Sequence, residues 1–154
     1  DPLRELAQSA FFHDTGKSFI DWSITNKGGP LNASEFAIMK LHPEFGFTAL
    51  GETGEVPEYT LYGVRHHHEK LNGKGYPLGL KAPRIDLGIR IITLVDMYDA
   101  LTTRRVYREA YTGYEALQSI KGLVGEEIDE KVFEGFINLL GETVVPEKPI
   151  IDIH

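Results

Sequence analysis

The segment Arg65–Pro77, with the sequence RHHHEKLNGKGYP, decides how the rest of the chain is interpreted. It places three consecutive histidines before a glutamate and a glycine-rich turn. Successive side chains leave a helix in directions about 100° apart, so the three imidazoles cannot all point into one apolar core. Neutral imidazole is the commonest side-chain metal ligand. The segment therefore predicts a metal site, and the alternative is a solvated polar helix end.

Further candidate ligands occur elsewhere in the chain as His13 with Asp14, as His42 before Pro43, and as Asp96. Each has a structural alternative when it is taken alone, since Asp14 suits a helix end and a lone histidine before proline is often structural. Asp96 lies on the most apolar segment of the chain, where a buried carboxylate needs a partner. Together with the triplet, these residues form a set of nitrogen and oxygen ligands suited to Fe, Mn, Zn or Ni.

The composition limits the classes of protein that need to be considered. A length of 154 residues corresponds to one domain, and 42% hydrophobic residues are enough for a core. The formal charge of −7 argues against binding of DNA, RNA or an anionic membrane. The chain has no cysteine, which excludes disulfides and thiolate metal sites, and no apolar run approaches the roughly 18 residues of a membrane span.

Hydrophobic periodicity and capping residues predict an all-α fold of about seven helices. We expect helices over 2–12, 32–40, 43–50, 57–68, 87–101, 112–123 and 129–141. The apolar helix over 87–101 is expected to be central. Residues 19–31 are expected to form a loop, and 72–84 a long ordered loop of the kind that often carries function. Residues 142–154 are expected to form an extended tail.

Taken together, these features resemble the HD-GYP family, a bacterial branch of the HD-domain metal-dependent phosphohydrolases. The resemblance runs from about Leu3 to Leu140. It rests on His13-Asp14 with Gly16-Lys17, His42-Pro43, His67-His68-Glu69, Gly73, Gly75-Tyr76-Pro77, Arg90-Ile91, Asp96, Tyr98-Asp99-Ala100-Leu101-Thr102, Arg105, Tyr107 and Arg108. It implies an HD-domain helical bundle over 1–141 with a long Gly-Tyr-Pro loop. It also implies a bacterial cytoplasmic enzyme that hydrolyses the messenger cyclic di-GMP to pGpG or GMP.

The resemblance also implies a role for each matching residue. Two divalent metals would be held by His13, Asp14, His42, His67, His68 and Asp96, with Asp14 bridging them. Fe or Mn is favoured, Ni, Zn or Mg is an alternative, and a third metal stays open. A hydroxide between the metals would attack phosphorus.

Other residues would act on the substrate or on the ligands. Lys17 would contact the scissile phosphate, Arg105 and Arg108 would grip the ligand, and Tyr76 would shape the pocket. Glu69 would orient a ligand histidine, and Asp99 would organise Lys17 and the arginines. The Gly-Tyr-Pro loop would also contact a GGDEF-type or other signalling protein.

The chain departs from the family pattern at four positions, namely Thr15, Asn72, Arg104 and Val106. The family also takes a histidine ligand from a helix before His13, so we expect the first helix or helices to lie outside this chain. Two alternatives stay open. One is a catalytically weak HD-GYP sensor or protein-interaction module, and the other is an HD phosphohydrolase of another nucleotide.

Overall fold

The computed structural model describes residues 1–104 and 109–144, with side chains described up to residue 141. These residues form eight α-helices and two 3-10 helices. The elements are α1 Pro2–Phe12, η1 Thr15–Phe19, α2 Trp22–Thr25, α3 Ala33–Met39, α4 His42–Gly51, α5 Glu58–His66, η2 Ala82–Arg84, α6 Leu87–Thr102, α7 Gly113–Lys121 and α8 Glu130–Val144. In this part of the chain only isolated β-bridges occur beside the helices, which confirms the all-α prediction.

Most helices begin where a capping residue predicts. Asp1 accepts a hydrogen bond from the Leu3 amide, and Asp86 accepts one from the Ile89 amide. Asn32 with Glu35 forms a complete capping box at the start of α3, and Thr112 with Glu115 forms another at the start of α7. These starts were predictable because a cap is a local interaction with first-turn amides.

Two of the α-helices, α2 and α8, differ from the prediction by more than two residues. Residues 19–31, expected as a loop, contain α2, which Asp21 caps through the Ser23 amide. Helix α8 continues to Val144, although Gly141 was expected to close it. A glycine in a helix interior costs only about 1 kcal/mol, so it stops a helix only when the chain turns there. The proposed tail therefore does not begin at 142, and residues 145–154 lie outside the described residues.

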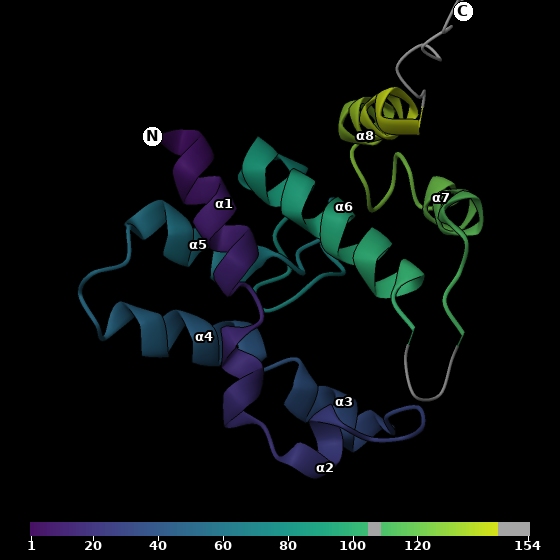
Figure 1. Cartoon of the computed structure of the whole chain (residues 1–154). Helices are drawn as coiled ribbons and strands as arrows, with labels where there is room; N and C mark the ends of the chain where they lie inside the picture. Colours follow the sequence, from purple (N-terminus) through teal and green to yellow (C-terminus); the bar gives the residue numbers. More distant parts are fainter. Residues whose placement is uncertain (105–108, 145–154) are drawn as a thin grey trace, which may run out of the picture.

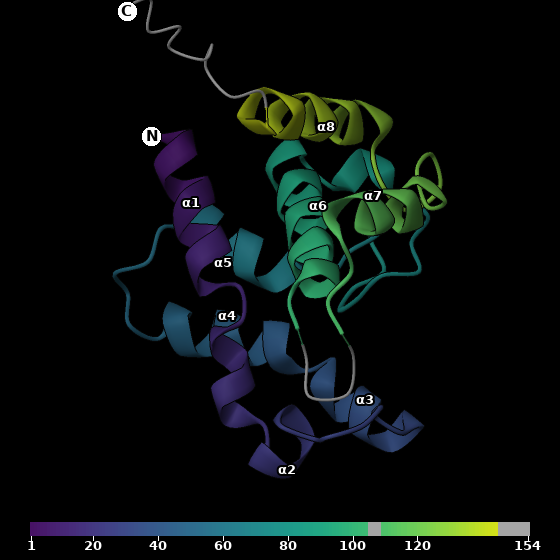
Figure 2. The same ribbon diagram turned by 45° about the vertical axis from the view of Figure 1, so that its right-hand side comes forward.

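Helix α6 occupies the centre of the molecule (Figures 1 and 2). It packs against α1 and α5 on one side and against α7 and α8 on the other, while α4 packs on α5 and η1. The main apolar core lies between α6, α7 and α8, around Leu94, Ile120, Ile128 and Phe133. The central position predicted for this apolar helix is thus confirmed. Among the described residues, no helix combines the length and the hydropathy that a bilayer-spanning segment needs.

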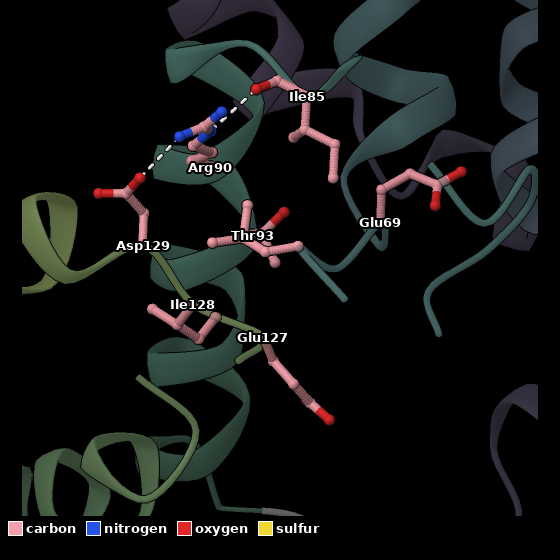
Figure 3. A pocket seen from close by; sticks show the side chains of 8 residues that line it. Glu69, Ile85, Arg90, Thr93, Glu127, Ile128 and Asp129 are labelled. Carbon is pink, nitrogen blue, oxygen red and sulfur yellow. Dashed lines mark hydrogen bonds and ion pairs between the residues drawn. The ribbon is translucent and has the colours of Figure 1, made fainter. Parts of the chain in front are cut away.

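The segment between α5 and α6 is an ordered loop, as predicted. Asn72 accepts a hydrogen bond from the Lys74 amide, so it initiates the turn. The guanidinium of Arg90 donates to the carbonyls of Ala82 and Ile85, and it pairs with Asp129 at 2.7 Å. Figure 3 shows Ile85, Arg90 and Asp129 among the residues that line a pocket. Its volume of about 10 Å³ is close to the minimum for one water molecule.

Candidate metal centre

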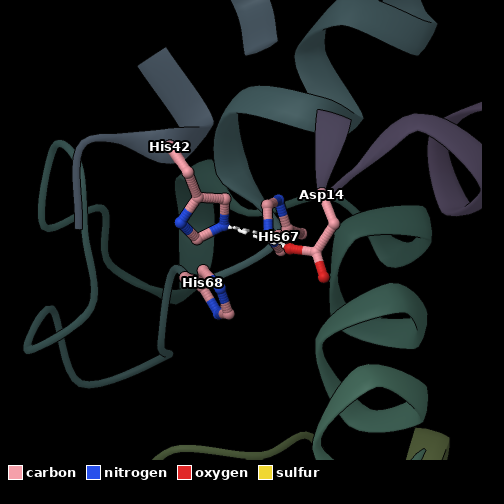
Figure 4. Close-up of side chains that lie close together, drawn as sticks. All are labelled: Asp14, His42, His67 and His68. Atoms are coloured by element: carbon pink, nitrogen blue, oxygen red, sulfur yellow. Dashed lines mark hydrogen bonds and ion pairs between the residues drawn. The ribbon is translucent and has the colours of Figure 1, made fainter. Parts of the chain in front are cut away.

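Four predicted ligands converge at the meeting point of η1, α4 and α5. One donor atom each from Asp14, His42, His67 and His68 lies within 4.8 Å of all the others (Figure 4). Asp14 directly precedes η1, His42 begins α4, and His67 and His68 follow the last residue of α5. Residues far apart in sequence therefore bring nitrogen and oxygen donors to one place, and His42 and His67 are almost completely buried there.

A close backbone contact holds Asp14 beside His42. Gly16 in η1 packs directly on the start of α4, where a Cβ at this position would collide with the His42 carbonyl oxygen and lie 2.6 Å from the Gly46 amide nitrogen. Only glycine allows this approach, because the groups in the way are backbone atoms. The Gly16 position is thus part of what places the Asp14 carboxylate next to the histidines.

Three of the predicted ligand histidines are oriented in the same way. The Nδ1 atoms of His13, His42 and His67 lie 2.7, 2.7 and 2.8 Å from the carbonyl oxygens of Ala10, Met39 and Val64. A carbonyl only accepts, so each Nδ1 carries the proton and, in the neutral ring, Nε2 keeps a lone pair. The hydroxyl of Thr93 on α6 also donates to the His67 carbonyl, which fixes the triplet's backbone.

The resulting lone pairs face one another. The Nε2 atoms of His42 and His67 are 3.1 Å apart, and neither has a proton to donate when both rings are neutral. Two neighbouring nitrogen ligands on one ion with bonds of ~2.1 Å lie about 3.0–3.4 Å apart, depending on the coordination geometry. The spacing therefore fits two donors to a single cation.

The two oxygens of Asp14 face different groups. Oδ1 lies 3.3 Å from His42 Nε2 and 4.0 Å from His67 Nε2, and it is buried without a hydrogen-bond partner. Oδ2 lies 2.6 Å from Lys17 Nζ and 3.3 Å from His13 Nε2. A buried carboxylate oxygen that faces imidazole lone pairs fits a bound cation, because such an arrangement is otherwise costly.

Asp96 extends the cluster from α6. Its Oδ1 lies 3.5 Å from His13 Nε2, and its Oδ2 lies 3.8 Å from His68 Nδ1. The six predicted ligands therefore form two adjoining groups, one around His42 and His67 and one around His13 and Asp96. Asp14 has an oxygen toward each group, which is the arrangement that a bridging carboxylate requires.

The ionisation of the cluster follows from burial and from the two aspartates. Burial lowers the pKa of His42 and of His67, and lowers that of His68 to about 4, so these rings are neutral and can coordinate. Burial acts in the same direction on His13, but hydrogen bonds to Asp14 and Asp96 raise its pKa to about 10. A metal ion would have to displace this proton from His13.

Tyr76 forms one wall of the cluster. Its ring centroid lies 4.7 Å from that of His68 and 6.5 Å from that of His42. Burial, together with the nearby charges of Asp96 and Asp14, raises the pKa of Tyr76, so the phenol keeps its proton at neutral pH. The predicted position of Tyr76 at the pocket is thus consistent with the structure.

Other predicted site residues lie elsewhere. Asp99 is exposed, and its carboxylate lies 3.4 Å from the hydroxyl of Thr103. Asp99 was expected to organise Lys17, but the Lys17 ammonium donates a hydrogen bond to Asp14. The carboxylate of Glu69 accepts hydrogen bonds from the loop, and the histidine nearest to it is His66, outside the predicted ligand set. Arg105 and Arg108, with Val106 and Tyr107, lie outside the described residues.

Sequence reasoning did not identify the groups that orient the ligands. The hydroxyl of Thr93 and the carbonyls of Ala10, Met39 and Val64 hold the imidazoles and their backbone. The carbonyls share a signal, since each lies three residues before its histidine. That spacing occurs for every helical histidine, so it could not have been recognised as functional without the fold.

Comparisons with known proteins identify the family of this chain. Residues 2–132 match the family described as "HD domain". A cyclic di-GMP phosphodiesterase of Pseudomonas aeruginosa is 34% identical over 142 residues, which cover 92% of this chain and 34% of that protein. A 3'3'-cGAMP-specific phosphodiesterase of Vibrio cholerae is 33% identical over 123 residues, which cover 79% of this chain and 24% of that protein.

The fold also matches a solved structure, an "HDG"Y"P protein" of Bdellovibrio bacteriovorus, with a TM-score of 0.72 and 18% identity. That match covers 89% of this chain and 43% of the other. The chain thus spans only about a third or less of the two curated relatives, and less than half of the solved structure. By the family match and by its motifs, this chain belongs to the HD domain family, in the HD-GYP branch.

Proposed function

We propose that this chain is the catalytic domain of a metal-dependent phosphodiesterase that hydrolyses cyclic di-GMP to pGpG or GMP. One observation carries the proposal, namely the buried, unpartnered Oδ1 of Asp14 facing the Nε2 atoms of His42 and His67. A cation completes this arrangement, whereas a structural polar cluster would pair these atoms with donors. The similarity to a cyclic di-GMP phosphodiesterase supports the choice of substrate.

The two adjoining groups of donors would hold two divalent ions. His42 and His67 would hold one ion, His13 and Asp96 would hold the other, and Asp14 would contribute an oxygen to each, with His68 at the edge of both groups. We propose Fe or Mn, with Ni, Zn or Mg as alternatives, because imidazole and carboxylate ligands suit these metals. When bound, such ions activate water as a nucleophile and stabilise charge on phosphoryl oxygens.

The chain's own residues would bind and orient the substrate around the ions. The Lys17 ammonium is held 2.6 Å from Asp14 and remains partly exposed, so it can contact a phosphate at the rim of the site. Tyr76 would wall the pocket on the His68 side and offer its phenolic proton as a donor. Arg105 and Arg108 keep their predicted role of binding phosphate or guanine.

The test measures hydrolysis and metal content on the same purified sample. The chain is loaded with Mn or Fe, metal is counted, and cyclic di-GMP and its products are separated by chromatography. We expect turnover with about two metals per chain. Bound metal without turnover would contradict the enzyme proposal and favour a catalytically weak sensor or interaction module.

The Gly-Tyr-Pro loop is also the proposed contact with a GGDEF-type protein. The side chain of Leu78 in this loop is exposed, which leaves the loop accessible for that contact.

A second substrate belongs in the same assay. One relative is named as specific for 3'3'-cGAMP, which has the same phosphodiester ring with adenine in place of one guanine. We expect faster hydrolysis of cyclic di-GMP, and a clear preference for 3'3'-cGAMP would move the chain to the other-nucleotide alternative. The proposed setting is the bacterial cytoplasm, as predicted from the resemblance.

A further inference from the structure

The two ends of the segment His66–Glu69 serve different parts of the molecule. His67 and His68 contribute donors to the cluster, whereas Glu69 is directed to the Gly-Tyr-Pro loop. Glu69 is 1% exposed, and its carboxylate accepts hydrogen bonds of 2.8 Å from the Leu78 amide and of 2.8 Å from the Leu80 amide. Figure 3 shows the carboxylate pointing away from Arg90 and Asp129, which are paired with each other.

These two hydrogen bonds are the compensation that the structure gives to a buried charge. Removing a carboxylate from water is costly unless donors replace the lost hydration. Amides that donate to a carboxylate form bonds roughly twice as strong as those between neutral groups. Glu69 therefore binds the returning half of the loop firmly, on both sides of Gly79, whose φ of +64° provides the turn.

A second set of contacts holds the loop at Gly75 and Tyr76. The Tyr76 amide donates to the His68 carbonyl at 3.2 Å, and Gly75 lies so close to residues 68–70 that a Cβ there would collide with the Lys70 amide. Two hydrogen bonds thus fix this part of the loop to the segment His66–Glu69. One runs from the Tyr76 amide to His68, and the other runs from the Leu78 amide to Glu69. The Tyr76 ring is thereby held against His68.

Three of the predicted ligand histidines, His13, His42 and His67, do not depend on Glu69 for their orientation. His42 and His67 are held through Nδ1 by the carbonyls of Met39 and Val64. The histidine that approaches Glu69 is His66, with Nδ1 at 3.8 Å from its carboxylate, and the His66 ring packs on Tyr62. Glu69 therefore contacts the site through the loop.

We propose that Glu69 is a positioning residue that acts through the loop amides of Leu78 and Leu80 to hold Tyr76 in the wall of the site, and that it does not act by orienting a metal ligand. The effect on hydrolysis rests on the function proposed above. The contact itself and its independence from the metal ligands do not, so they can be tested without activity.

The first test substitutes Glu69→Gln, which keeps the size of the side chain but leaves one acceptor oxygen for two amides. Hydrogen exchange of the Leu78 and Leu80 amides, followed by NMR on the full chain, should become at least about tenfold faster. Metal content after Mn loading should equal that of the original chain. The matched control is Glu127→Gln, which neutralises a carboxylate of the same pocket that is paired with Lys70. It should leave exchange of both amides unchanged.

The second test asks whether Glu69 acts through Tyr76. Glu69→Gln, Tyr76→Ala and the double variant are compared for KM and kcat with cyclic di-GMP. Each single variant should raise KM by about tenfold, and the double variant should be no worse than Tyr76→Ala alone. A residue that only stabilises the fold would instead give increments in KM that multiply.

Gly75→Ala provides a variant that leaves the carboxylate intact but displaces the same loop. It should reproduce the result of Glu69→Gln, with retained metal, faster exchange at Leu78 and Leu80, and a raised KM. Loss of metal from Glu69→Gln with unchanged amide exchange would overturn the proposal, as would multiplying KM effects in the double variant. If the original chain hydrolyses no cyclic dinucleotide, the proposed function fails, while amide exchange and metal content still decide the role of Glu69.

Discussion

Two carboxylates with buried oxygens lie on opposite sides of the segment His66–Glu69, and they are stabilised in opposite ways. Glu69 faces the Gly-Tyr-Pro loop, here called the loop side, and Asp14 faces the ligand histidines, here called the metal side. On the loop side, the Glu69 carboxylate accepts hydrogen bonds from two amides and needs no further partner to be stable in the interior. On the metal side, the Nε2 atoms of His42 and His67 are 3.1 Å apart and face the unpartnered Oδ1 of Asp14. The Glu69 carboxylate is therefore satisfied by the protein alone, whereas the Asp14 carboxylate is satisfied only with a cation.

This difference separates supporting residues from candidate functional ones. Both sides are buried and both contain a carboxylate next to histidines, so burial and residue type alone do not distinguish them. They differ in whether the buried carboxylate oxygens accept hydrogen bonds from donors of the protein. Breaking each side should therefore give different phenotypes: loss of metal on one side, and loss of loop order with metal retained on the other.

The largest effect should come from removing the shared ligand of the metal side. Asp14→Ala deletes the carboxylate that faces both donor groups, so metal content should fall to near zero and kcat/KM by about a thousandfold or more. Metal analysis and cyclic di-GMP hydrolysis on one sample check this. Glu44→Ala, which removes a carboxylate paired with Arg65 outside the cluster, should change neither quantity. Full metal content with unchanged turnover in Asp14→Ala would refute the dinuclear site.

Removing the metal should affect stability on the same side. A ligand that binds only the folded chain stabilises it by about 2.7 kcal/mol when its free concentration is 100 times Kd. We therefore expect Mn to raise the Tm of chelator-treated protein and Asp14→Ala to abolish that rise. Calorimetry with and without Mn, on the original chain and on Asp14→Ala, checks both expectations. Glu69→Gln should retain the Mn-dependent rise, and its disappearance there would mean that the two sides are not separable.

Much of the fold was predictable because its determinants are local. Capping by Asn32, Asp86 and Thr112 defines helix starts within a few residues, and the apolar run of α6 predicts a central helix. The end of α8 was not predictable, because Gly141 stops a helix only if the following backbone turns. Helix α2 is one turn long, too short for periodicity to reveal it.

The predicted metal ligands form a compact cluster because residue type and motif order reflect the chemistry directly. The role of Glu69 was less accessible to sequence reasoning. Its partners, Leu78 and Leu80, are recognised through backbone amides, which every residue but proline has. Only the path of the loop determines which amides reach the carboxylate, so this contact could not be inferred from side-chain identities.

The placement of Asp14 beside His42 can be disturbed without changing any ligand. In Gly16→Ala the new methyl group would meet the His42 carbonyl, so η1 must move away from α4, at a cost of about 1–3 kcal/mol. We expect weaker Mn binding and a lower free energy of unfolding in urea. Gly29→Ala is the matched control, because beyond the adjacent residues no described atom would lie within 4 Å of the new Cβ. Equal Mn affinities in the two variants would show that the Gly16 contact does not position Asp14.

The smallest effect concerns the loop-facing side and its dependence on pH. Arg90 joins the loop carbonyls of Ala82 and Ile85 to Asp129 at the start of α8. Burial opposes ionisation of Asp129, but the Val132 amide and Arg90 hold its pKa below the ordinary value. A lowered carboxyl pKa adds stability that is present above the unfolded-state pKa of about 4 and is lost as pH falls through the lower folded-state pKa.

Asp129→Asn should therefore cost less than about 1 kcal/mol at pH 6, as is usual for a partly exposed ion pair. It should also flatten the acid-side decline in the free energy of unfolding below pH 4. Urea unfolding at a series of pH values checks this in metal-free protein, so that proton competition at the histidines does not contribute. The loop amides of Leu78 and Leu80 should stay protected in the variant, because Glu69 holds them independently of Arg90. Faster exchange at these amides would show that the loop is held as one unit with α8, and the comparison would then have to be drawn between the metal cluster and the whole assembly of loop, α6 and α8.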